Sequence, residues 1–196
     1  MFAGENNLLV ILSSPSGVGK TTITKKIQQK YSAFKISVSH TTRKMRSNEV
    51  DGIDYHFVNT NEFEKLIKEK KFYEHARIFG NYYGTLKKNI DKDVEKNDIL
   101  FDIDWQGTKQ LSKHKNLNLI KIFLIASDKN ELKARLIKRN QNTKREVDLR
   151  FDSFDEDVKY WRDYDYIVIN KNLDNCFNQI MKIIKDNKKT NIFRSI

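Results

Sequence analysis

The order of hydrophobic and polar residues predicts strands and helices that alternate along the chain. Strands that alternate with helices form a parallel sheet covered on both faces, so the predicted fold class is α/β. Short apolar runs of strand length occupy residues 8–12, 35–38, 99–103, 119–126 and 166–170. Helical patterns are predicted at about 20–31, 130–139 and 172–185, with a further helix that ends near residue 161.

One long stretch, from about residue 37 to residue 88, breaks this alternation. We interpret it as an inserted antiparallel lobe. In chain order it contains a polar segment at 39–54, the strand-like YHFV from Tyr55, a helix at 61–71 with Asn61 as its N-cap, a strand from Phe72, and the turn-rich NYYG that follows.

Length and composition indicate one folded domain. The chain has 196 residues, of which 38% are hydrophobic and 32% charged, enough apolar groups to offset chain ordering. The net charge of +11 suggests an anionic partner, which is nucleic acid, an anionic membrane or a phosphorylated metabolite. Charge alone does not choose among them.

Cysteine content and the N-terminal residues favour a cytoplasmic protein without a membrane partner. The single Cys176 excludes an intramolecular disulfide and a cysteine-based zinc site. The first residues lack a basic region, and their apolar run LLVIL is too short for a secretion signal. No segment approaches the roughly 20 apolar residues of a membrane span.

The sharpest motif is SSPSGVGKTT, which follows a predicted strand and opens a predicted helix. Backbone N–H groups and the helix N-terminus form an anion nest there, Lys20 reaches the β- and γ-phosphates, and the Thr21 hydroxyl suits Mg²⁺. Ser14 stands where the first glycine of such loops is usual. The candidate triphosphate-binding residues are Ser13, Ser14, Pro15, Ser16, Gly17, Val18, Gly19, Lys20, Thr21 and Thr22.

Two further features allow more than one interpretation. Asp102 lies at the end of the apolar run 99–103. One interpretation is that its carboxylate contacts Mg²⁺, directly or through water. The other is that Asp102 is an ordinary helix N-cap preceding Trp105. Arg43 and Arg46, three residues apart in a polar segment, suit a monophosphate, or are exposed to solvent.

Several blocks taken together resemble the guanylate kinase family. They are SPSGVGKTT, SVSHTTR, EVDGIDYHF, EHARIFGNYYGT, LFDIDWQG and YDYIVIN, and they follow the family order over nearly the whole chain. The resemblance implies a P-loop nucleoside-monophosphate kinase fold and the reaction ATP + GMP = ADP + GDP with Mg²⁺. It implies a single domain with a parallel-sheet core at about 1–36, 89–126 and 164–196, a GMP-binding lobe at about 37–88 and a lid at about 127–163.

The resemblance also implies the GMP contacts. Glu74 and Asp104 accept hydrogen bonds from guanine N1–H and the 2-amino group, which adenine lacks. Such polar mismatches can discriminate by roughly 10⁴–10⁵. Alternatively, Glu74 is a surface residue, and Tyr83 or Thr85 only shapes a turn. The implied phosphate contacts are Arg43, Arg46, Tyr55 and Tyr83, and the implied contacts near guanine O6 are Ser39 and Thr85.

The lid and the last strand carry the remaining candidates. Arg139 and Arg150 match family lid arginines that hold the transferring phosphate, so with Lys20 they form the predicted catalytic set. Arg135 is either a lid arginine or a charge on a helix surface. Asn170 approaches the adenine of ATP by resemblance, or caps the helix that follows it.

Three rival functions are weighed against GMP phosphorylation. An inactive guanylate-kinase-like interaction module commonly loses phosphate-loop residues, which this chain keeps. A P-loop kinase for another acceptor would be exposed by acceptor competition. Nucleic-acid binding rests only on the net charge of +11 and predicts salt-steep binding. The sequence does not indicate an oligomeric state.

Overall fold

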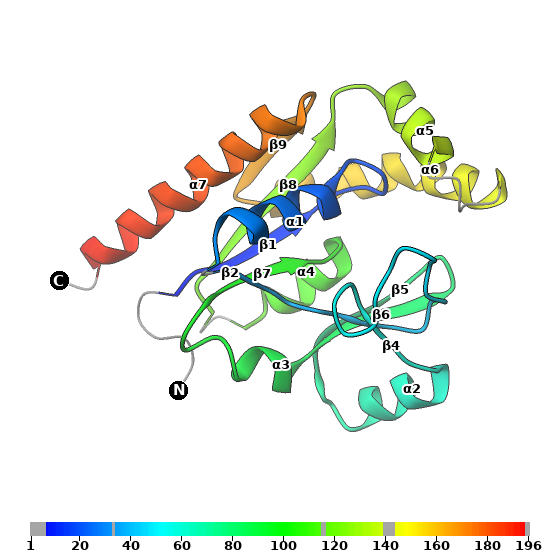
Figure 1. The fold of residues 1–196 in the computed structure, drawn as a ribbon, viewed down its shortest axis with the longest axis horizontal. Coiled ribbons are helices and arrows are strands. Elements are labelled where there is room, and N and C mark those ends of the chain that lie inside the picture. Colours follow the sequence, from blue (N-terminus) through cyan, green and yellow to red (C-terminus); the bar gives the residue numbers. More distant parts are fainter. Residues whose placement is uncertain (1–6, 33, 115–116, 139–143, 195–196) are drawn as a thin grey trace.

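A five-stranded parallel sheet forms the centre of the fold (Figure 1). The computed structural model describes residues 7–32, 34–114, 117–138 and 144–194. The strand order is β2-β7-β1-β8-β9, and every adjacent pair is parallel. This arrangement confirms the predicted α/β fold class. The strands are β1 (Leu9–Ser13), β2 (Phe34–Ile36), β7 (Asp98–Asp102), β8 (Leu119–Ala126) and β9 (Tyr166–Asn170).

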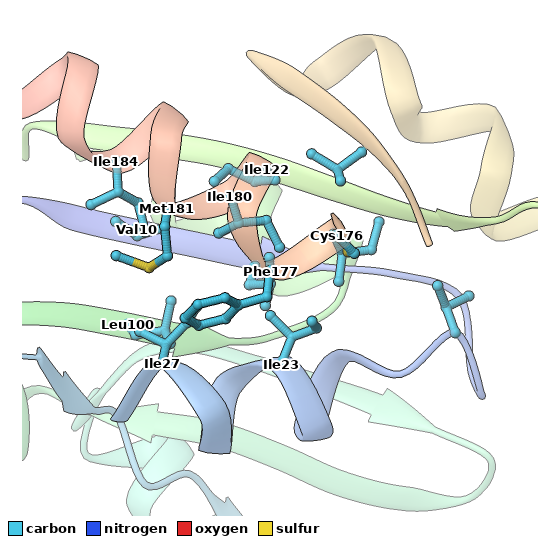
Figure 2. Packing of buried hydrophobic residues seen from close by; sticks show 14 of the residues in the cluster. Val10, Ile23, Ile27, Leu100, Ile122, Cys176, Phe177, Ile180, Met181 and Ile184 are labelled. Carbon is cyan, nitrogen blue, oxygen red and sulfur yellow. The ribbon is translucent and has the colours of Figure 1, made fainter. Parts of the chain in front are cut away.

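Helices cover both faces of this sheet because alternate strand residues point to opposite sides. On one face, α1 (Lys20–Lys30) and α7 (Leu173–Arg194) pack Ile27 and Phe177 against Val10 (Figure 2). α5 (Lys129–Lys138) and α6 (Lys144–Val158) extend the same core. On the other face, Ile11 packs in a second cluster with α3 (Lys87–Asp91) and α4 (Trp105–Leu111).

A second, four-stranded sheet forms the inserted lobe. Its order is β4-β3-β6-β5, with the strands β3 (His40–Thr41), β4 (His56–Phe57), β5 (Phe72–Ile78) and β6 (Asn81–Leu86). The prediction of an antiparallel lobe is wrong for one pair, because β3 and β4 are parallel. The segment between these two strands returns to the same end of the sheet before β4 begins. α2 (Thr60–Lys68) buries Phe63 against Phe72 and Tyr82, at ring distances of 4.5 and 5.2 Å.

Several element boundaries differ from the predicted ones. The N-cap of α2 is Asn59, not Asn61, because the Asn59 side chain accepts the hydrogen bond from the Glu62 N–H. NYYG begins β6, and the turn lies one step earlier, where Phe79 and Gly80 have positive φ angles. α6 ends at Val158 and leads into the short 3-10 helix η1 (Lys159–Asp163), so the helix end predicted near residue 161 falls within η1. α7 runs to Arg194, beyond the predicted helix end at residue 185.

Cys176 is a free cysteine, buried in the core between α7 and the sheet. Within the described ranges, no helix has both the length and the apolar character needed to cross a bilayer.

Candidate active site

The loop between β1 and α1 adopts a conformation that only glycine accommodates at two positions. Gly17 and Gly19 have φ angles of 86° and 109°. A Cβ on Gly17 would lie 2.9 Å from Leu132 and Leu136 of α5, and one on Gly19 would lie 2.8 Å from Asn170 Nδ2. These glycines therefore let α5 and β9 approach the loop closely, besides leaving its backbone open to a phosphate.

Lys20, the first residue of α1, is held by the end of β7. Its Nζ lies 2.7 Å from Asp102 Oδ1 and donates a hydrogen bond of 2.9 Å to the Ile103 carbonyl. Parallel pairing of β1 with β7 brings the two strand ends together at one edge of the sheet. Asp102 does not cap α4, because the N-cap of that helix is Asp104.

Two buried carboxylates lie where the inserted lobe meets the core. Glu74 of β5 is 3% exposed, and within the described part of the chain its Oε1 has no hydrogen-bond partner. Burial raises the pKa of Glu74 to about 7, and the nearby Asp104 adds to the rise, while hydrogen bonds from Thr85 oppose it. Burial also raises the pKa of Asp104, although Asp104 Oδ1 accepts from the Gly107 N–H at 2.9 Å. The site therefore holds two acceptors that are costly to leave unpaired.

Hydroxyl groups line the same end of the small sheet. Ser39 Oγ lies 3.4 Å from Thr85 Oγ1, and Ser37 Oγ lies at the same distance. Thr85 is fully buried, so its hydroxyl meets Glu74 and the two serines rather than the cleft. Of the two residues expected near guanine O6, Ser39 alone lines the cleft.

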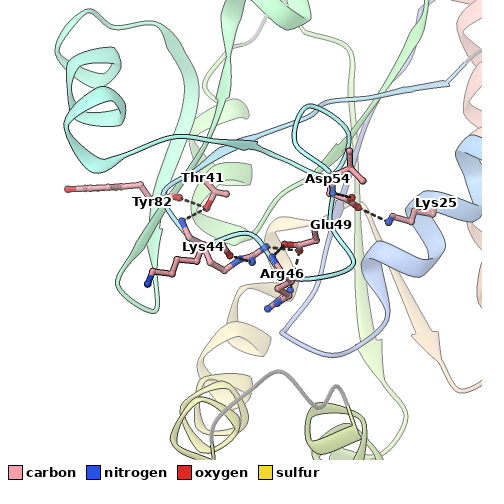
Figure 3. A network of polar contacts seen from close by, with 9 residues as sticks. Lys25, Thr41, Lys44, Arg46, Glu49, Asp54 and Tyr82 are labelled. Atoms are coloured by element: carbon pink, nitrogen blue, oxygen red, sulfur yellow. Dashed lines mark hydrogen bonds and ion pairs between the residues drawn. The ribbon is translucent and has the colours of Figure 1, made fainter.

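A glutamate organises the two arginines of the lobe (Figure 3). Glu49 Oε1 accepts a hydrogen bond of 2.7 Å from Arg43, and Oε2 accepts one of 2.8 Å from the Arg46 N–H. Burial alone would raise the pKa of Glu49, but these bonds outweigh it and lower the pKa. The Arg43 guanidinium also lies 5.4 Å from the centre of the Tyr55 ring, which is itself 5.9 Å from that of Tyr83. The four predicted phosphate contacts thus form one group.

α6 reaches the phosphate loop through Arg150. Its Nη1 donates a hydrogen bond of 3.0 Å to Ser16 Oγ, and its guanidinium lies 5.1 Å from the centre of the Phe79 ring. Arg135 instead pairs with Glu131 on the surface of α5, with 40% of its side chain exposed, and it does not line the cleft. Arg139 lies outside the described residues.

Most of these groups border one cleft of about 570 Å³ between the core, the inserted lobe and α6. Among the described residues that were predicted for the site, five do not line it: Ser13, Val18, Thr22, Thr85 and Asn170. The predicted residues that line it are Ser14, Pro15, Ser16, Gly17, Gly19, Lys20, Thr21, Ser39, Arg43, Arg46, Tyr55, Glu74, Tyr83, Asp102, Asp104 and Arg150.

Comparison with known proteins decides the family. The family model described as guanylate kinase matches residues 6–187. The chain belongs to the guanylate kinase family. It is 43% identical over 181 residues to a guanylate kinase of Novosphingobium aromaticivorans, covering 92% of this chain and 82% of the relative. It is 39% identical over 186 residues to a guanylate kinase of Rickettsia bellii, and the match covers 94% of this chain and 97% of the relative.

A solved structure agrees with this assignment. The crystal structure of guanylate kinase from Anaplasma phagocytophilum superposes with a TM-score of 0.78 at 29% identity, and it covers 96% of this chain and 89% of that one. Membership of the guanylate kinase family supports the predicted P-loop kinase fold, with the second sheet as the lobe inserted into the parallel core.

Asn170 has a structural contact that the sequence did not indicate. Its Nδ2 donates a hydrogen bond of 2.7 Å to the Val18 carbonyl, and the residue is 4% exposed. Asn170 therefore stabilises the phosphate loop of this guanylate kinase through its side-chain bond to the Val18 carbonyl. It does not cap α7 with its side chain, since Asn172 Oδ1 accepts from the Asp174 and Asn175 N–H groups.

Sequence reasoning missed several residues that shape the site. Glu49 is the clearest, and a carboxylate three residues after Arg46 in an arginine-bearing segment was the available signal. Trp105 donates from Nε1 to Asp157 Oδ1 at 3.1 Å, and its ring stacks on Tyr160 at 3.7 Å. Burial, assisted by the charge of Asp104, raises the pKa of Asp157 to about 6. Asp157 lines the cleft from the lid side of this guanylate kinase.

The residues at the loop fit a Mg²⁺ ion that is shared with phosphate groups. Among the described residues there is no cluster of three or more His, Cys, Asp or Glu side chains of the kind that holds a metal alone. Mg²⁺ bound with a nucleotide needs only one or two protein oxygens, because phosphates and water complete its shell. The Thr21 hydroxyl and the Asp102 carboxylate both line the cleft beside Lys20 and supply that number.

Proposed function

We propose that this guanylate kinase binds ATP on the loop between β1 and α1 and GMP on the inserted lobe, with phosphoryl transfer in the cleft between them. Family membership assigns the reaction, in which the γ-phosphoryl group of ATP passes to GMP to give ADP and GDP. The residue assignments rest chiefly on one observation. A single cleft is lined by Lys20, by the carboxylates Glu74 and Asp104, and by the arginines Arg43 and Arg46.

Glu74 and Asp104 are proposed to select guanine. Guanine presents adjacent donors at N1 and N2, and Glu74 offers an oxygen with no other described hydrogen-bond partner. Adenine presents neither donor there, so AMP would leave Glu74 Oε1 without a partner in a closed site, while Asp104 keeps its bonds from Gly107 and Gln106. Ser39, with its hydroxyl beside Thr85, is proposed to contact the base near O6.

The 5′-phosphate of GMP is proposed to lie against Arg43, Arg46, Tyr55 and Tyr83. Glu49 orients both arginines before substrate arrives, which lowers the ordering cost of binding. Guanidinium groups make forked hydrogen bonds to phosphate oxygens, and the tyrosine hydroxyls add single donors.

The transfer step needs positioning and charge neutralisation more than covalent chemistry. An anionic phosphate oxygen of GMP attacks the γ-phosphorus of ATP in line, and the bond to the β–γ bridging oxygen breaks, so no general base is required. Lys20, Arg150 and Arg139 are proposed to stabilise the charge on the transferring group. The contact between Arg150 and Ser16 supports this role for Arg150, because it brings α6 to the phosphate loop.

Thr21 and Asp102 are proposed to hold Mg²⁺ beside Lys20. When bound, the ion neutralises charge on the β- and γ-phosphates and fixes their geometry. Lys20 keeps its ammonium group near these phosphates because Asp102 and the Ile103 carbonyl direct it toward the end of β7.

Three mobile units are proposed on the predicted boundaries. They are a core of about 1–36, 89–126 and 164–196, a GMP-binding lobe of about 37–88 and a lid of about 127–163. The separate sheet at 40–86 supports the second unit, and α5 with α6 supports the third. Closure of these units over both nucleotides would exclude water, which otherwise accepts the phosphoryl group.

ADP release with ATP, Mg²⁺ and each nucleoside monophosphate in turn tests the assignment. We expect turnover with GMP alone and its loss in Lys20→Ala, with Lys30→Ala, on the same helix and away from the cleft, as the matched control. Turnover with another monophosphate at comparable kcat/KM would contradict the proposed base selection. Loss of activity in both lysine variants would contradict the role of Lys20.

A further inference from the structure

The strand β9 forms an edge of the central sheet and carries two exposed isoleucines. Within the described residues, no strand pairs with its outer side, and the sheet ends there beside α7 (Figure 1). Ile167 and Ile169 are 44% and 57% exposed. Folded proteins normally protect an edge strand with charge, proline or a covering element, so an apolar open edge indicates a binding surface.

The two faces of β9 are occupied differently. Val168 and Asn170 are buried, and the Tyr166 hydroxyl accepts a hydrogen bond of 3.0 Å from Asn187 of α7. Because successive strand residues point to opposite faces, Ile167 and Ile169 lie on the face that α7 does not cover.

The main chain of β9 also presents groups outward. The Asp165 N–H donates to the Lys121 carbonyl of β8 at 2.9 Å. Main-chain groups of alternate residues point to opposite sides of a strand, so the odd-numbered residues face β8. Tyr166, Val168 and Asn170 therefore direct their N–H and C=O groups away from the sheet, where an added strand can bond them.

We propose that β9 is an interface for a second copy of this chain, with two β9 strands pairing antiparallel about a two-fold axis at Val168. The outward main-chain groups of Val168 then bond those of its counterpart, and those of Tyr166 bond Asn170 of the second copy. The two sheets join into one, and the edge disappears. A two-fold interface must be self-complementary, and this strand meets that condition.

Side chains on the exposed face match in this register. Ile167 lies opposite Ile169 of the second copy, and Asp165 lies opposite Lys171. A shift of the axis to Ile167 or Ile169 would place an isoleucine opposite a charged residue, so the pattern selects one register. The Asp165 carboxylate accepts from the Lys121 N–H at 2.8 Å and lies 3.6 Å from Lys121 Nζ, so it faces β8, and the register rests on the isoleucine pair.

Charge around the strand favours self-association over binding of an anionic partner. The chain as a whole carries +11. The four charged residues that flank β9 sum to zero, with two cations and two anions, namely Arg162, Asp163, Asp165 and Lys171. Lys121 of β8 contacts Asp163 and Asp165 and brings this strip to +1, so two copies meet there with much less repulsion than the charge of the whole chain would give.

Sedimentation velocity over a micromolar concentration series tests the proposal. We expect the wild-type chain to dimerise and Ile169→Lys to raise the dimer Kd by at least about 100-fold, since the buried lysines would lack partners. Ile137→Lys, at an exposed isoleucine of α5, is the control that should dimerise normally. GMP kinase turnover shows that each variant is folded. A monomeric wild-type chain throughout the series, or a dimer that Ile169→Lys leaves intact, would overturn the proposal.

Cysteine cross-linking tests the register separately. In a Cys176→Ser background, the double variant Ile167→Cys with Ile169→Cys places each new thiol opposite its complement, so oxidation should give a covalent dimer. Neither single variant brings two thiols together. Equal cross-linking of the single and double variants, or none in any of them, would overturn the antiparallel pairing.

Discussion

The carboxylate of Glu74 occupies the space that a side chain at Gly107 would need. A Cβ on Gly107 would lie 2.6 Å from Glu74 Oε2 and 3.1 Å from Glu74 Cδ. The Gly107 N–H also donates to Asp104 Oδ1. This one glycine in α4 therefore lies against both carboxylates proposed to select guanine, although it contacts no substrate in the proposed arrangement.

Gly107→Ala should impair GMP use without impairing ATP use. The added methyl group displaces the Glu74 carboxylate, and misplacement of a positioning group by about 1 Å can cost on the order of 10²-fold. We expect kcat/KM for GMP to fall by roughly this factor while the KM for ATP changes little. Lys109→Ala, on the exposed side of α4, is the matched control. Unchanged kinetics with GMP in a folded Gly107→Ala variant would show that Glu74 does not contact the base.

The raised pKa of Glu74 predicts that nucleotide-free protein loses stability as pH rises. Its pKa in the folded chain is about 7 against 4.5 for the free group, because burial disfavours the charged form. The folded state thus holds a proton that the unfolded state has released over this interval. The stabilising contribution is full below pH 4.5 and is lost as pH rises through about 7. Thermal unfolding should show the wild type losing stability relative to Glu74→Gln across this range.

The same group predicts a proton released when GMP binds. Guanine donors favour the ionised carboxylate, so near pH 7 a protonated Glu74 must give up its proton. Calorimetry in buffers of different ionisation enthalpy measures this release. Glu74→Gln retains the contribution from the GMP phosphate and lacks that of Glu74, so the difference isolates the carboxyl group. Equal proton release in the two proteins would contradict the assignment.

The core was predictable because its signals are local. The apolar run before Ser13, the glycines of the loop and the Lys20–Thr21 pair all lie within one strand, turn and helix, and hydrophobic periodicity reads such units directly. The inserted lobe was predicted less well, since β3 and β4 have two residues each and carry almost no periodic pattern. The parallel pairing of β3 with β4 depends on the path of the segment that connects them. Hydrophobic periodicity does not encode that path.

The site residues also divide into those that local sequence motifs predict and those that only the folded chain brings together. Residues inside contiguous motifs, such as Lys20 and Arg43, were identifiable from type and spacing. The role of Gly107 and the contact of Trp105 with Asp157 depend on segments that are distant in sequence and meet only in the folded chain, whereas Glu49 lies within six residues of both its arginines. Asn170 was placed at the right strand end, but its bond to the Val18 carbonyl spans 152 residues and leaves no trace in local pattern.

Lys25 of α1 bridges the core to the inserted lobe, and its removal should favour an open form. Its Nζ lies 2.6 Å from Asp54 Oδ1, and this bond lowers the pKa of Asp54. Since the folded pKa is depressed, the contact persists at neutral pH and is lost only as pH falls through the acid range. X-ray scattering should give Lys25→Ala a larger radius of gyration without nucleotides, with Lys30→Ala unchanged. A wild-type radius in Lys25→Ala would show that the pair does not restrain the lobe.

Arg150 and Arg135 offer a matched test of which lid arginine acts in transfer. Arg150 reaches Ser16 of the phosphate loop at 3.0 Å, whereas Arg135 pairs with Glu131 on the surface of α5. An arginine that stabilises a transferring phosphoryl group is worth roughly 10³–10⁵ in rate. We therefore expect Arg150→Ala to lower kcat by about 10³-fold or more with a small change in the KM for GMP. Arg150→Lys should recover part of this loss because it restores charge without the forked donors.

Arg135→Ala should leave kcat within about twofold, since an exposed pair on a helix surface contributes little. Single-turnover measurements separate the chemical step from product release and show whether the Arg150 effect lies in transfer. Equal losses in both variants would indicate that α5 and α6 act through lid stability rather than through one guanidinium. A loss confined to the KM for ATP in Arg150→Ala would instead assign Arg150 to ground-state binding, because only an interaction stronger in the transition state raises kcat.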